Sequence, residues 1–334
     1  MRRHLATFLA LVTLAPYLLG ANVPVANSGW DRLPHMELYG REFVDLPAWA
    51  EAHHLSLEWD KRTGDLRLTN RWSRLAFVID SRRAEINGVR VWLSIPITPH
   101  NLSVCIAATD LQTVLQPLLD PPQNKPSQKI HTVAIDPGHG GRDPGNLAGR
   151  EQEKVHTLIL ARKIKAMLEE AGLRAVLTRT TDQFIDLPVR NAIAKKSDAD
   201  LFVSLHYNAA EHTHGGVKGV EVYCLTPPGV QSTNSRGDDT PTPSNPGNGF
   251  NSKNILLAYE LQASLVKNLE VEDRGVRRAR FVVLKNPEMP AVLVEGGFMT
   301  DPAEAKSIFD DAHKEEFARA VVDGILAYKR LVER

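Results

Sequence analysis

The sequence predicts an α/β protein, with a mostly parallel twisted sheet flanked by helices, preceded by a small α+β module. From about residue 130, short apolar runs typical of buried strands alternate with amphipathic helical runs, a pattern that indicates a largely parallel sheet. Before residue 120, short alternating segments flank two turn signals, Thr63-Gly64 and Asn87-Gly88. The proline-rich polar segment 121–129 separates these two sequence patterns and is expected to be a linker.

The 334 residues are enough for two domains, which we place at 30–120 and 130–334. Lysine plus arginine and aspartate plus glutamate both number 40, so the zero net charge gives no support for a nucleic-acid partner. Cys105 and Cys224 fall in different domains. We expect two free, buried thiols and no cysteine metal site.

The N-terminus has the layout of a secretory signal peptide over residues 1–21. Arg2 and Arg3 precede an apolar run at 5–19, and small residues follow at Gly20 and Ala21. A membrane anchor is the alternative, but the run is shorter than the roughly 20 residues of a membrane span. We therefore expect cleavage near Ala21, no stable membrane span afterwards, and a location in the periplasm or extracellular cell envelope.

The first domain begins with a strand leading into a helix, GREFVDLPAWAEAHHL, and continues through the two hairpins. DLQTVLQPLL is expected to be a closing helix with Asp110 as its N-cap. This order of elements resembles the copper-amine-oxidase N-terminal-like domain that is attached to bacterial envelope enzymes. The resemblance implies a role in positioning the enzyme on the envelope, and the sequence contains no copper site.

The second domain starts with the strand TVAID and a helix, EKVHTLILARKIKAMLEEAG, that ends at Gly172. Then follow the strand LRAVLT, a helix with Pro188 in its first turn, the strands ADLFVSLH and GVEVYCL, the helix ILLAYELQASLVKNL, the strand AVLVEGG and a final helix. Segment 227–252 interrupts this alternation of strands and helices, because Val230 and Phe250 are its only large apolar residues. We expect a mobile loop whose ends lie about 25–30 Å apart when unconstrained, long enough to arch over a site.

Polar side chains follow three of these strands. His139 comes after VAIDPG, His206 after LFVSL, and Glu295 after AVLV. The carboxyl ends of parallel strands share one sheet edge, where open α/β sheets place their active sites. Two histidines and a carboxylate suggest zinc, which in catalytic sites takes three protein ligands and leaves a fourth position for water. Glu153, in the first turn of the next helix, is the natural third ligand; the alternative is an acid that only favours the helix dipole.

Other polar residues are candidates for support of this site or for substrate contact. Asp136 and Asp143 are expected to brace the glycine-rich loop, as outer partners of a ligand histidine. For Arg190 we favour a structural ion pair over a substrate contact, and for Asn208 a loop-shaping role over a substrate contact. The basic run 274–280, RGVRRAR, either lies on a solvated face, which we favour, or faces an anionic wall polymer.

Residues from about 130 to 330 resemble the zinc-dependent N-acetylmuramoyl-L-alanine amidases of the Amidase_3 class, which are bacterial peptidoglycan hydrolases. The resemblance is carried by DPGHGGRDPG, the EK of REQEKV, the R of LPVRNA, ADLFVSLHYNA, GVEVY, DRGVRRARFVVL and PAVLVEGGFMTDPAEA. It implies that His139, Glu153 and His206 bind one zinc ion per chain and that Glu295 is catalytic. SLHYN replaces the family's SIHAN and keeps the histidine. The bond cut would join N-acetylmuramic acid to L-alanine of the stem peptide.

The resemblance also implies peptidoglycan as partner and a role in wall turnover or daughter-cell separation. Some relatives carry an extra helix that occupies the zinc cleft until a partner removes it. Segment 227–252 lies at the corresponding insertion but has no amphipathic period, so we expect no helical plug, and the need for an activator protein stays open. Two alternatives remain: a zinc hydrolase with another amide substrate, such as a peptidase, and a non-catalytic wall-binding protein.

Overall fold

The computed structural model describes residues 32–210, 216–235 and 243–334. The expected signal peptide at 1–21 lies outside these residues. Among the helices in the described ranges, none is both long and apolar enough to cross a bilayer.

The described part of the N-terminal module runs from residue 32 to about residue 120. Its elements are β1 (His35–Leu38), β2 (Arg41–Asp45), α1 (Leu46–Ala52), β3 (Ser56–Asp60), β4 (Asp65–Thr69), β5 (Arg74–Val78), β6 (Arg83–Ile86), β7 (Val89–Trp92), β8 (Thr98–His100), β9 (Ser103–Ala107), α2 (Ala108–Asp110), the π-helical turn η2 (Leu111–Leu115) and α3 (Gln116–Leu119). Both predicted hairpins form, as β3–β4 and β6–β7. Asn87 and Gly88 take the positive φ angles, 49° and 85°, of a tight hairpin turn.

Asp110 is not the N-cap that its sequence suggested. The helical stretch begins two residues earlier, at Ala108, and Asp110 is fully buried. Its carboxylate accepts hydrogen bonds from the backbone N–H groups of Ser94 and Ile95, at 2.8 and 2.9 Å. The residue therefore joins the helix to the loop between β7 and β8 instead of starting the helix.

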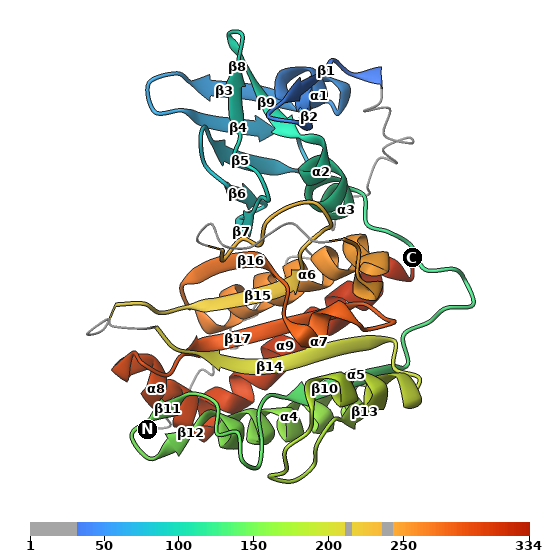
Figure 1. The fold of residues 1–334 in the computed structure, drawn as a ribbon, viewed down its shortest axis with the longest axis vertical. Helices are drawn as coiled ribbons and strands as arrows, with labels where there is room; N and C mark the ends of the chain where they lie inside the picture. The colour runs from blue at the N-terminus through green and yellow to red at the C-terminus, as the bar shows by residue number, and fades with distance from the viewer. Residues whose placement is uncertain (1–31, 211–215, 236–242) are drawn as a thin grey trace, which may run out of the picture.

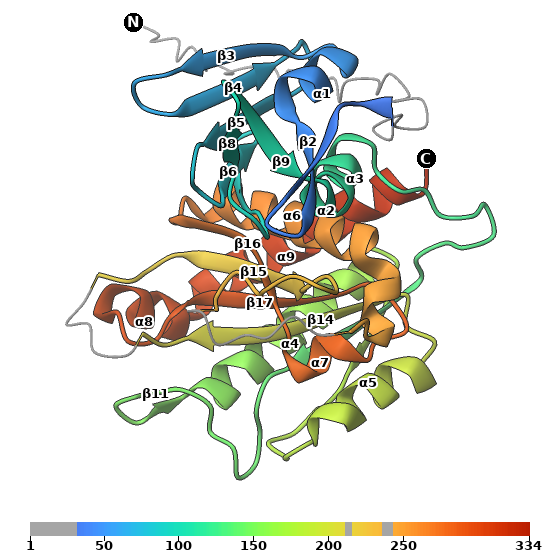
Figure 2. The same cartoon turned by 45° about the horizontal axis from the view of Figure 1, so that its top comes forward.

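The C-terminal domain contains the alternating elements that the sequence predicts. They are β10 (Thr132–Pro137), β11 (Leu147–Ala148), β12 (Glu151–Gln152), α4 (Glu153–Glu170), β13 (Arg174–Leu177), α5 (Leu187–Lys196), β14 (Leu201–Asn208), β15 (Val220–Leu225), the 3-10 turn η3 (Pro246–Phe250), α6 (Asn251–Leu269), β16 (Asp273–Ala279), α7 (Val282–Lys285), β17 (Ala291–Phe298), α8 (Pro302–Phe309) and α9 (Asp311–Val332). Helices α4, α6 and α9 pack together on one face of the sheet, and α5 and α7 lie on the other (Figures 1 and 2).

One twisted sheet runs through both parts of the chain. Its eleven strands have the order β13-β10-β14-β17-β15-β16-β7-β6-β5-β4-β3, so the module's meander extends the sheet of the C-terminal domain (Figure 1). The junction is a parallel pairing of β16 with β7, at Val276 and Val91. The remaining strands of the module form a separate four-stranded sheet, β1-β2-β9-β8.

Within the C-terminal domain the sheet is mostly parallel, as predicted, with one reversal. β13, β10, β14 and β17 pair in parallel, and β15 and β16 are parallel to each other, but β15 is antiparallel to β17. Strands β15 and β16 therefore end at the edge opposite to the one where β10, β14 and β17 end.

This reversal changes the expected course of segment 227–252. The segment leaves β15 at the edge away from His139, and its described residues are hydrogen-bonded there. Thr233 N donates to Arg278 O at 2.9 Å, and Asn248 Nδ2 donates to Thr226 O at 3.0 Å. These residues thus do not arch over the strand ends that carry the histidines. The segment's two acids, Asp238 and Asp239, which a helical plug would need, lie outside the described residues.

The linker at 121–129 lies against the C-terminal end of α9. Asn124 N donates to Val332 O at 2.7 Å, and the side chain of Gln123 donates to Leu331 O at 2.9 Å. Just beyond it, Ile130 N donates to the Glu333 carboxylate at 2.6 Å. The segment is therefore anchored along its length to the last helix.

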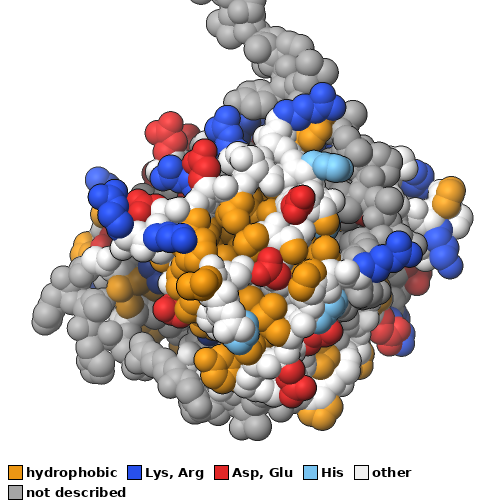
Figure 3. Space-filling view, turned by 90° about the horizontal axis from the view of Figure 1, so that it is seen from above, with side chains coloured by type: hydrophobic (Ala, Val, Ile, Leu, Met, Phe, Trp, Pro, Cys, Tyr) orange, Lys and Arg blue, Asp and Glu red, His pale blue; other side chains and the backbone are white. Residues whose placement is uncertain are grey.

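The free end of the module offers a mixed surface. Figure 3 views this end directly: hydrophobic side chains gather in the middle of the face, with acidic side chains among them, and both basic and acidic side chains stand around them. Large apolar side chains also project from the module's turns, since Tyr39, Trp72 and Leu102 are all exposed.

Candidate metal and catalytic site

The glycine-rich loop after β10 turns His139 back over the sheet edge. His139 has a positive φ of 60°, and Gly140 and Gly141 follow with φ of 123° and 58°. A run of left-handed residues is unfavourable, so the loop needs fixed partners. The buried Arg179 supplies them, donating to Pro137 O and Gly138 O at 3.0 and 2.8 Å.

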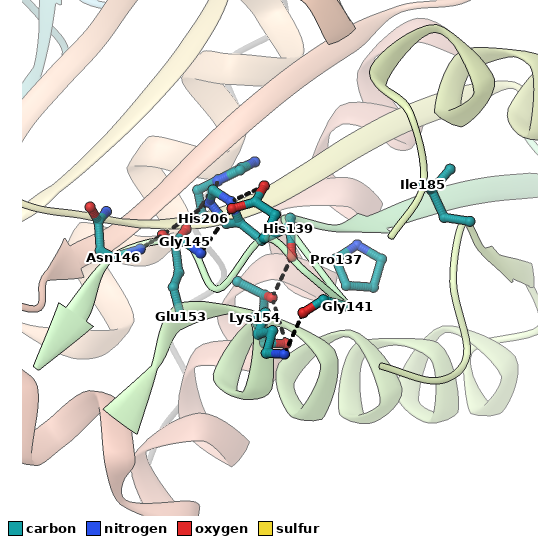
Figure 4. A network of polar contacts seen from close by, with 12 residues as sticks. Pro137, His139, Gly141, Gly145, Asn146, Glu153, Lys154, Ile185 and His206 are labelled. Atoms are coloured by element: carbon teal, nitrogen blue, oxygen red, sulfur yellow. Dashed lines mark hydrogen bonds and ion pairs between the residues drawn. The ribbon is translucent and has the colours of Figure 1, made fainter. Parts of the chain in front are cut away.

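Three predicted ligands converge at this edge. The Nε2 atom of His139 lies 3.0 Å from Glu153 Oε2, the Nδ1 atom of His206 lies 3.0 Å from Glu153 Oε1, and the two ring nitrogens are 3.2 Å apart. They come from the β10 loop, the first turn of α4 and the end of β14, and their side chains point toward one another (Figure 4). Among the described residues this is the group of three or more potential ligands whose atoms lie close enough to hold a metal ion.

The donor set and its spacing fit zinc. Two imidazole nitrogens and one carboxylate are a common three-ligand set, and tetrahedral bonds of about 2.0–2.2 Å place ligand atoms roughly 3.3–3.5 Å apart. The observed separations of 3.0–3.2 Å are close to that value. The Nδ1 atom of His139 is 2.9 Å from Asp143 Oδ2, which holds the proton on Nδ1 and leaves the Nε2 lone pair for a metal.

Glu153 is held in its charged form. It is fully buried, and its carboxylate accepts the backbone N–H groups of Tyr207 and Asn146, each at 2.9 Å. Burial alone would raise the pKa of Glu153, but the hydrogen bonds from His139 and His206 hold that pKa far below its usual range. A residue that served only the helix dipole would not need this burial or these bonds.

Gly145 makes room for two ligands at once. A Cβ atom there would lie 2.6 Å from Glu153 Oε2 and 2.6 Å from His139 Cδ2. We expect Gly145→Ala to weaken zinc binding at least tenfold, because both ligands must move. Gly149→Ala is the matched control, since Gly149 has a similar φ, 62° against 67°, with nothing within 4 Å of its Cβ position. Equal zinc affinities in the two variants, measured by competition with a chromophoric chelator, would contradict this reading.

Asp136 and Arg190 form a buried ion pair below the loop. Arg190 Nη1 lies 2.9 Å from Asp136 Oδ1, and both side chains are almost completely buried. Arg190 also donates to His139 O at 2.8 Å, and Asp136 accepts hydrogen bonds from Thr178 and Ser204. The structural ion pair that we favoured for Arg190 is present. Asp136 does not contact a ligand histidine; it reaches the loop through Arg190.

Breaking this pair should destabilise the fold. Arg190→Met leaves Asp136 buried without its charge partner, which typically costs about 3–5 kcal/mol of unfolding free energy. Asp136→Asn together with Arg190→Met should recover part of this loss because no unpaired charge remains. Urea unfolding of the two variants beside the unchanged protein measures both effects, and a loss below about 1 kcal/mol for Arg190→Met would show that the pair is dispensable.

Glu295, on strand β17, lies beside the three predicted ligands. It is the register partner of His206 across the parallel strands β14 and β17, so the two side chains leave the same face. Its Oε2 atom is buried and has no hydrogen-bond partner among the described residues. Burial raises the pKa of Glu295 well above its usual range, and the negative charges of Glu153 and Glu221 raise it further.

Glu221 is a site residue that the sequence reasoning missed. It is the register partner of Glu295 across the antiparallel pair β15–β17, and it is 3% exposed. Asn208 donates to it through Nδ2 at 2.6 Å, so Asn208 shapes the end of β14 by binding this carboxylate. The available signal was the charged residue inside the apolar strand GVEVYCL, but its neighbour could be identified only once the β15 reversal was known.

The sequence profile of the Amidase_3 family, N-acetylmuramoyl-L-alanine amidase, matches residues 133–327, more than half of the chain. The chain belongs to the Amidase_3 family. The matched range contains His139, Glu153, His206 and Glu295 and none of the N-terminal module, whose resemblance to a copper-amine-oxidase N-terminal-like domain stays a prediction.

Individual relatives are consistent with this family assignment. The chain is 34% identical over 199 residues to N-acetylmuramoyl-L-alanine amidase LytC of Bacillus subtilis, covering 60% of this chain and 36% of that protein. It is also 34% identical over 236 residues to N-acetylmuramoyl-L-alanine amidase AmiA of Salmonella typhimurium, covering 62% of this chain and 79% of that protein. The chain thus spans about a third of the first relative and most of the second.

Solved structures of N-acetylmuramoyl-L-alanine amidases share the fold of the C-terminal domain. N-acetylmuramoyl-L-alanine amidase AmiC2 of Nostoc punctiforme superposes with a TM-score of 0.51 and 32% identity, covering 60% of this chain and 97% of that one. The catalytic domain of the amidase CwlV from Bacillus (Paenibacillus) polymyxa gives a TM-score of 0.51 and 27% identity, covering 60% and 99%.

Proposed function

We propose that this Amidase_3 protein is a zinc-dependent peptidoglycan hydrolase that cleaves the amide bond between N-acetylmuramic acid and L-alanine of the stem peptide. The observation that carries the proposal is the convergence of His139, Glu153 and His206 within 4.8 Å, with Glu295 as the register partner of His206. The family indicates the substrate. The site contributes three candidate metal ligands and an adjacent carboxylate that can act as a base.

His139, Glu153 and His206 would hold the zinc ion. When bound, zinc supplies a Lewis acid that acidifies water and polarises an amide carbonyl. A divalent cation at these ligands would also offset the negative charge around Glu295 and favour its ionised form. Glu295 then takes a proton from the attacking water and delivers it to the leaving L-alanine nitrogen, a role that typically contributes about 10²–10⁴-fold.

The Oε2 atom of Glu295, which is buried and accepts no hydrogen bond within the described part of the chain, supports this role. A carboxylate that already accepted a hydrogen bond from the protein would have to exchange that bond for the water's proton. Asp143 keeps the His139 ring in one orientation through the 2.9 Å contact to Nδ1. The ligands and the base are thus arranged before substrate arrives.

The remaining elements of the proposal concern the cell. The relatives' activity on the wall and the signal-like N-terminus favour a periplasmic or extracellular location. The N-terminal module would contact the envelope through the end that Figure 3 shows, where hydrophobic side chains gather among charged ones. A role in wall turnover or cell separation follows from the substrate, and an activator protein is a further candidate partner.

Digestion of purified sacculi tests the function. The protein without residues 1–21 should release intact stem peptides with a free L-alanine amine, a chelator should stop the release, and zinc should restore it. A new peptide end elsewhere in the stem would identify a peptidase instead. Tight binding to sacculi without any released product, in protein that contains zinc, would favour the non-catalytic wall-binding alternative.

A further inference from the structure

A row of side chains crosses the sheet from the metal ligands to the N-terminal module. His206 on β14 pairs with Glu295 on β17, and Glu295 pairs with Glu221 on β15. Directly paired residues present their side chains on the same face of a sheet. The catalytic base therefore stands between a metal ligand on one side and a second carboxylate on the other.

Glu221 is held in place by charge. Its Oε2 atom lies 2.5 Å from Arg277 Nε and 3.5 Å from Arg274 Nε, and its Oε1 atom accepts the bond from Asn208. Such partners offset the cost of burying a carboxylate. The two arginines belong to the basic run 274–280, for which we had favoured a solvated face. Their side chains are only 23% and 14% exposed, because they turn toward Glu221.

Arg277 in turn is covered by the module. Its guanidinium carbon lies 4.8 Å from the ring centroid of Trp92, the last residue of β7. The indole is fixed at its other end, since Trp92 Nε1 donates to Arg274 O at 2.8 Å. The backbone beside it is fixed as well, because Arg90 N donates to Asp273 Oδ2 at 2.7 Å. An aromatic face at this distance attracts a guanidinium and limits its positions.

We propose that Trp92, Arg277 and Glu221 form a positioning row through which the N-terminal module orients the catalytic base Glu295. Glu221 presents a fixed negative charge to Glu295, which turns the Glu295 carboxylate toward the metal ligands. Arg277, engaged by Glu221 and Trp92, is kept from pairing with Glu295 and neutralising it. The module is then part of the catalytic machinery as well as a means of attachment. This inference rests on the proposed role of Glu295 in amide hydrolysis.

Trp92→Ala, Trp92→Phe and Tyr259→Phe test the row on the full chain. Tyr259→Phe is the matched control: its hydroxyl donates to Ile86 O at 2.9 Å, so it removes another contact between module and C-terminal domain, away from Glu221. The substrate is a soluble muramoyl peptide, so that attachment of the protein to the wall does not affect the measured rates. Zinc content and melting temperature are measured for each variant.

We expect Trp92→Ala to lower kcat about threefold to thirtyfold, the range of a cation–π contact, with KM and zinc content unchanged. Trp92→Phe should restore most of the loss because it keeps an aromatic face, and Tyr259→Phe should leave kcat unchanged. Equal kcat for Trp92→Ala and the unchanged protein would overturn the proposal. So would equal losses in Trp92→Ala and Tyr259→Phe, which would indicate a general effect of the interface.

Glu221→Gln provides a second route in case Trp92→Ala does not fold. It should lower kcat at least tenfold and free Arg277, and Glu221→Gln with Arg277→Gln should recover part of the loss because no guanidinium remains to neutralise Glu295. A double variant slower than Glu221→Gln would contradict the row. Absence of turnover in the unchanged, zinc-loaded protein would instead refute the proposed function itself.

Discussion

Glu295→Gln should remove activity and stabilise the metal-free protein. Turnover should fall about 10²–10⁴-fold because the amide cannot accept the proton of water. The pKa of Glu295 is raised in the folded state, so the carboxyl costs stability wherever the pH exceeds its unfolded value, about 4.3. Glutamine removes that cost, and the melting temperature at neutral pH should rise.

The two effects are measured on one preparation, as product release with zinc and as thermal unfolding after chelation. Because the cost of Glu295 disappears below its unfolded pKa, the difference in melting temperature between the two proteins should shrink as the pH falls toward 4. A variant that keeps more than a tenth of the activity would exclude Glu295 as the base. A lower melting temperature at neutral pH would mean that the carboxylate has a stabilising partner.

Glu153→Gln should abolish zinc binding and activity together. The substitution keeps the shape of the side chain but removes the charge that two histidines and two backbone N–H groups hold at this site. Loss of a ligand should weaken zinc binding more than the roughly 10–100-fold typical of an outer partner. Metal content after dialysis against a zinc buffer, together with product release, measures both.

Glu151→Gln is the control for this experiment. Glu151 lies two residues before Glu153, is about half exposed, and pairs with His156 instead of the histidines of the site. Its replacement should leave zinc content and activity unchanged. If Glu153→Gln bound zinc as tightly as Glu151→Gln, Glu153 would be no more than an acid at a helix N-terminus.

The sequence predicted the group of His139, Glu153 and His206 because the signals for these residues are local. His139, His206 and Glu295 each follow a run of buried-type residues, so the parallel-strand rule alone predicts a common edge. Glu153 was within reach of the same reasoning, since it opens the helix that follows the glycine-rich loop. A structural ion pair was expected for Arg190. No local pattern could identify its partner as Asp136, which lies 54 positions away in the sequence.

The sequence could not predict features that depend on how distant strands pair with each other. The direction of β15 depends on how it adds to β17, and an apolar six-residue strand reads the same in either direction. That one reversal moved segment 227–252 to the far edge of the sheet and brought Glu221 next to Glu295. Asp110 failed as a predicted N-cap for a similar reason: its partners, the N–H groups of Ser94 and Ile95, belong to the loop between β7 and β8.

The shared sheet also bears on where this chain can be divided. A fragment starting near residue 130 would contain the whole Amidase_3 match, yet it would strip β7 from β16. Strand β16 would then present unpaired N–H and C=O groups, which is how soluble sheets recruit unwanted partners and aggregate. It would also lose the anchoring of residues 121–129 along the last helix. The sensible unit for expression, or for recombination with another enzyme, is therefore the pair of domains, with the boundary placed before β1.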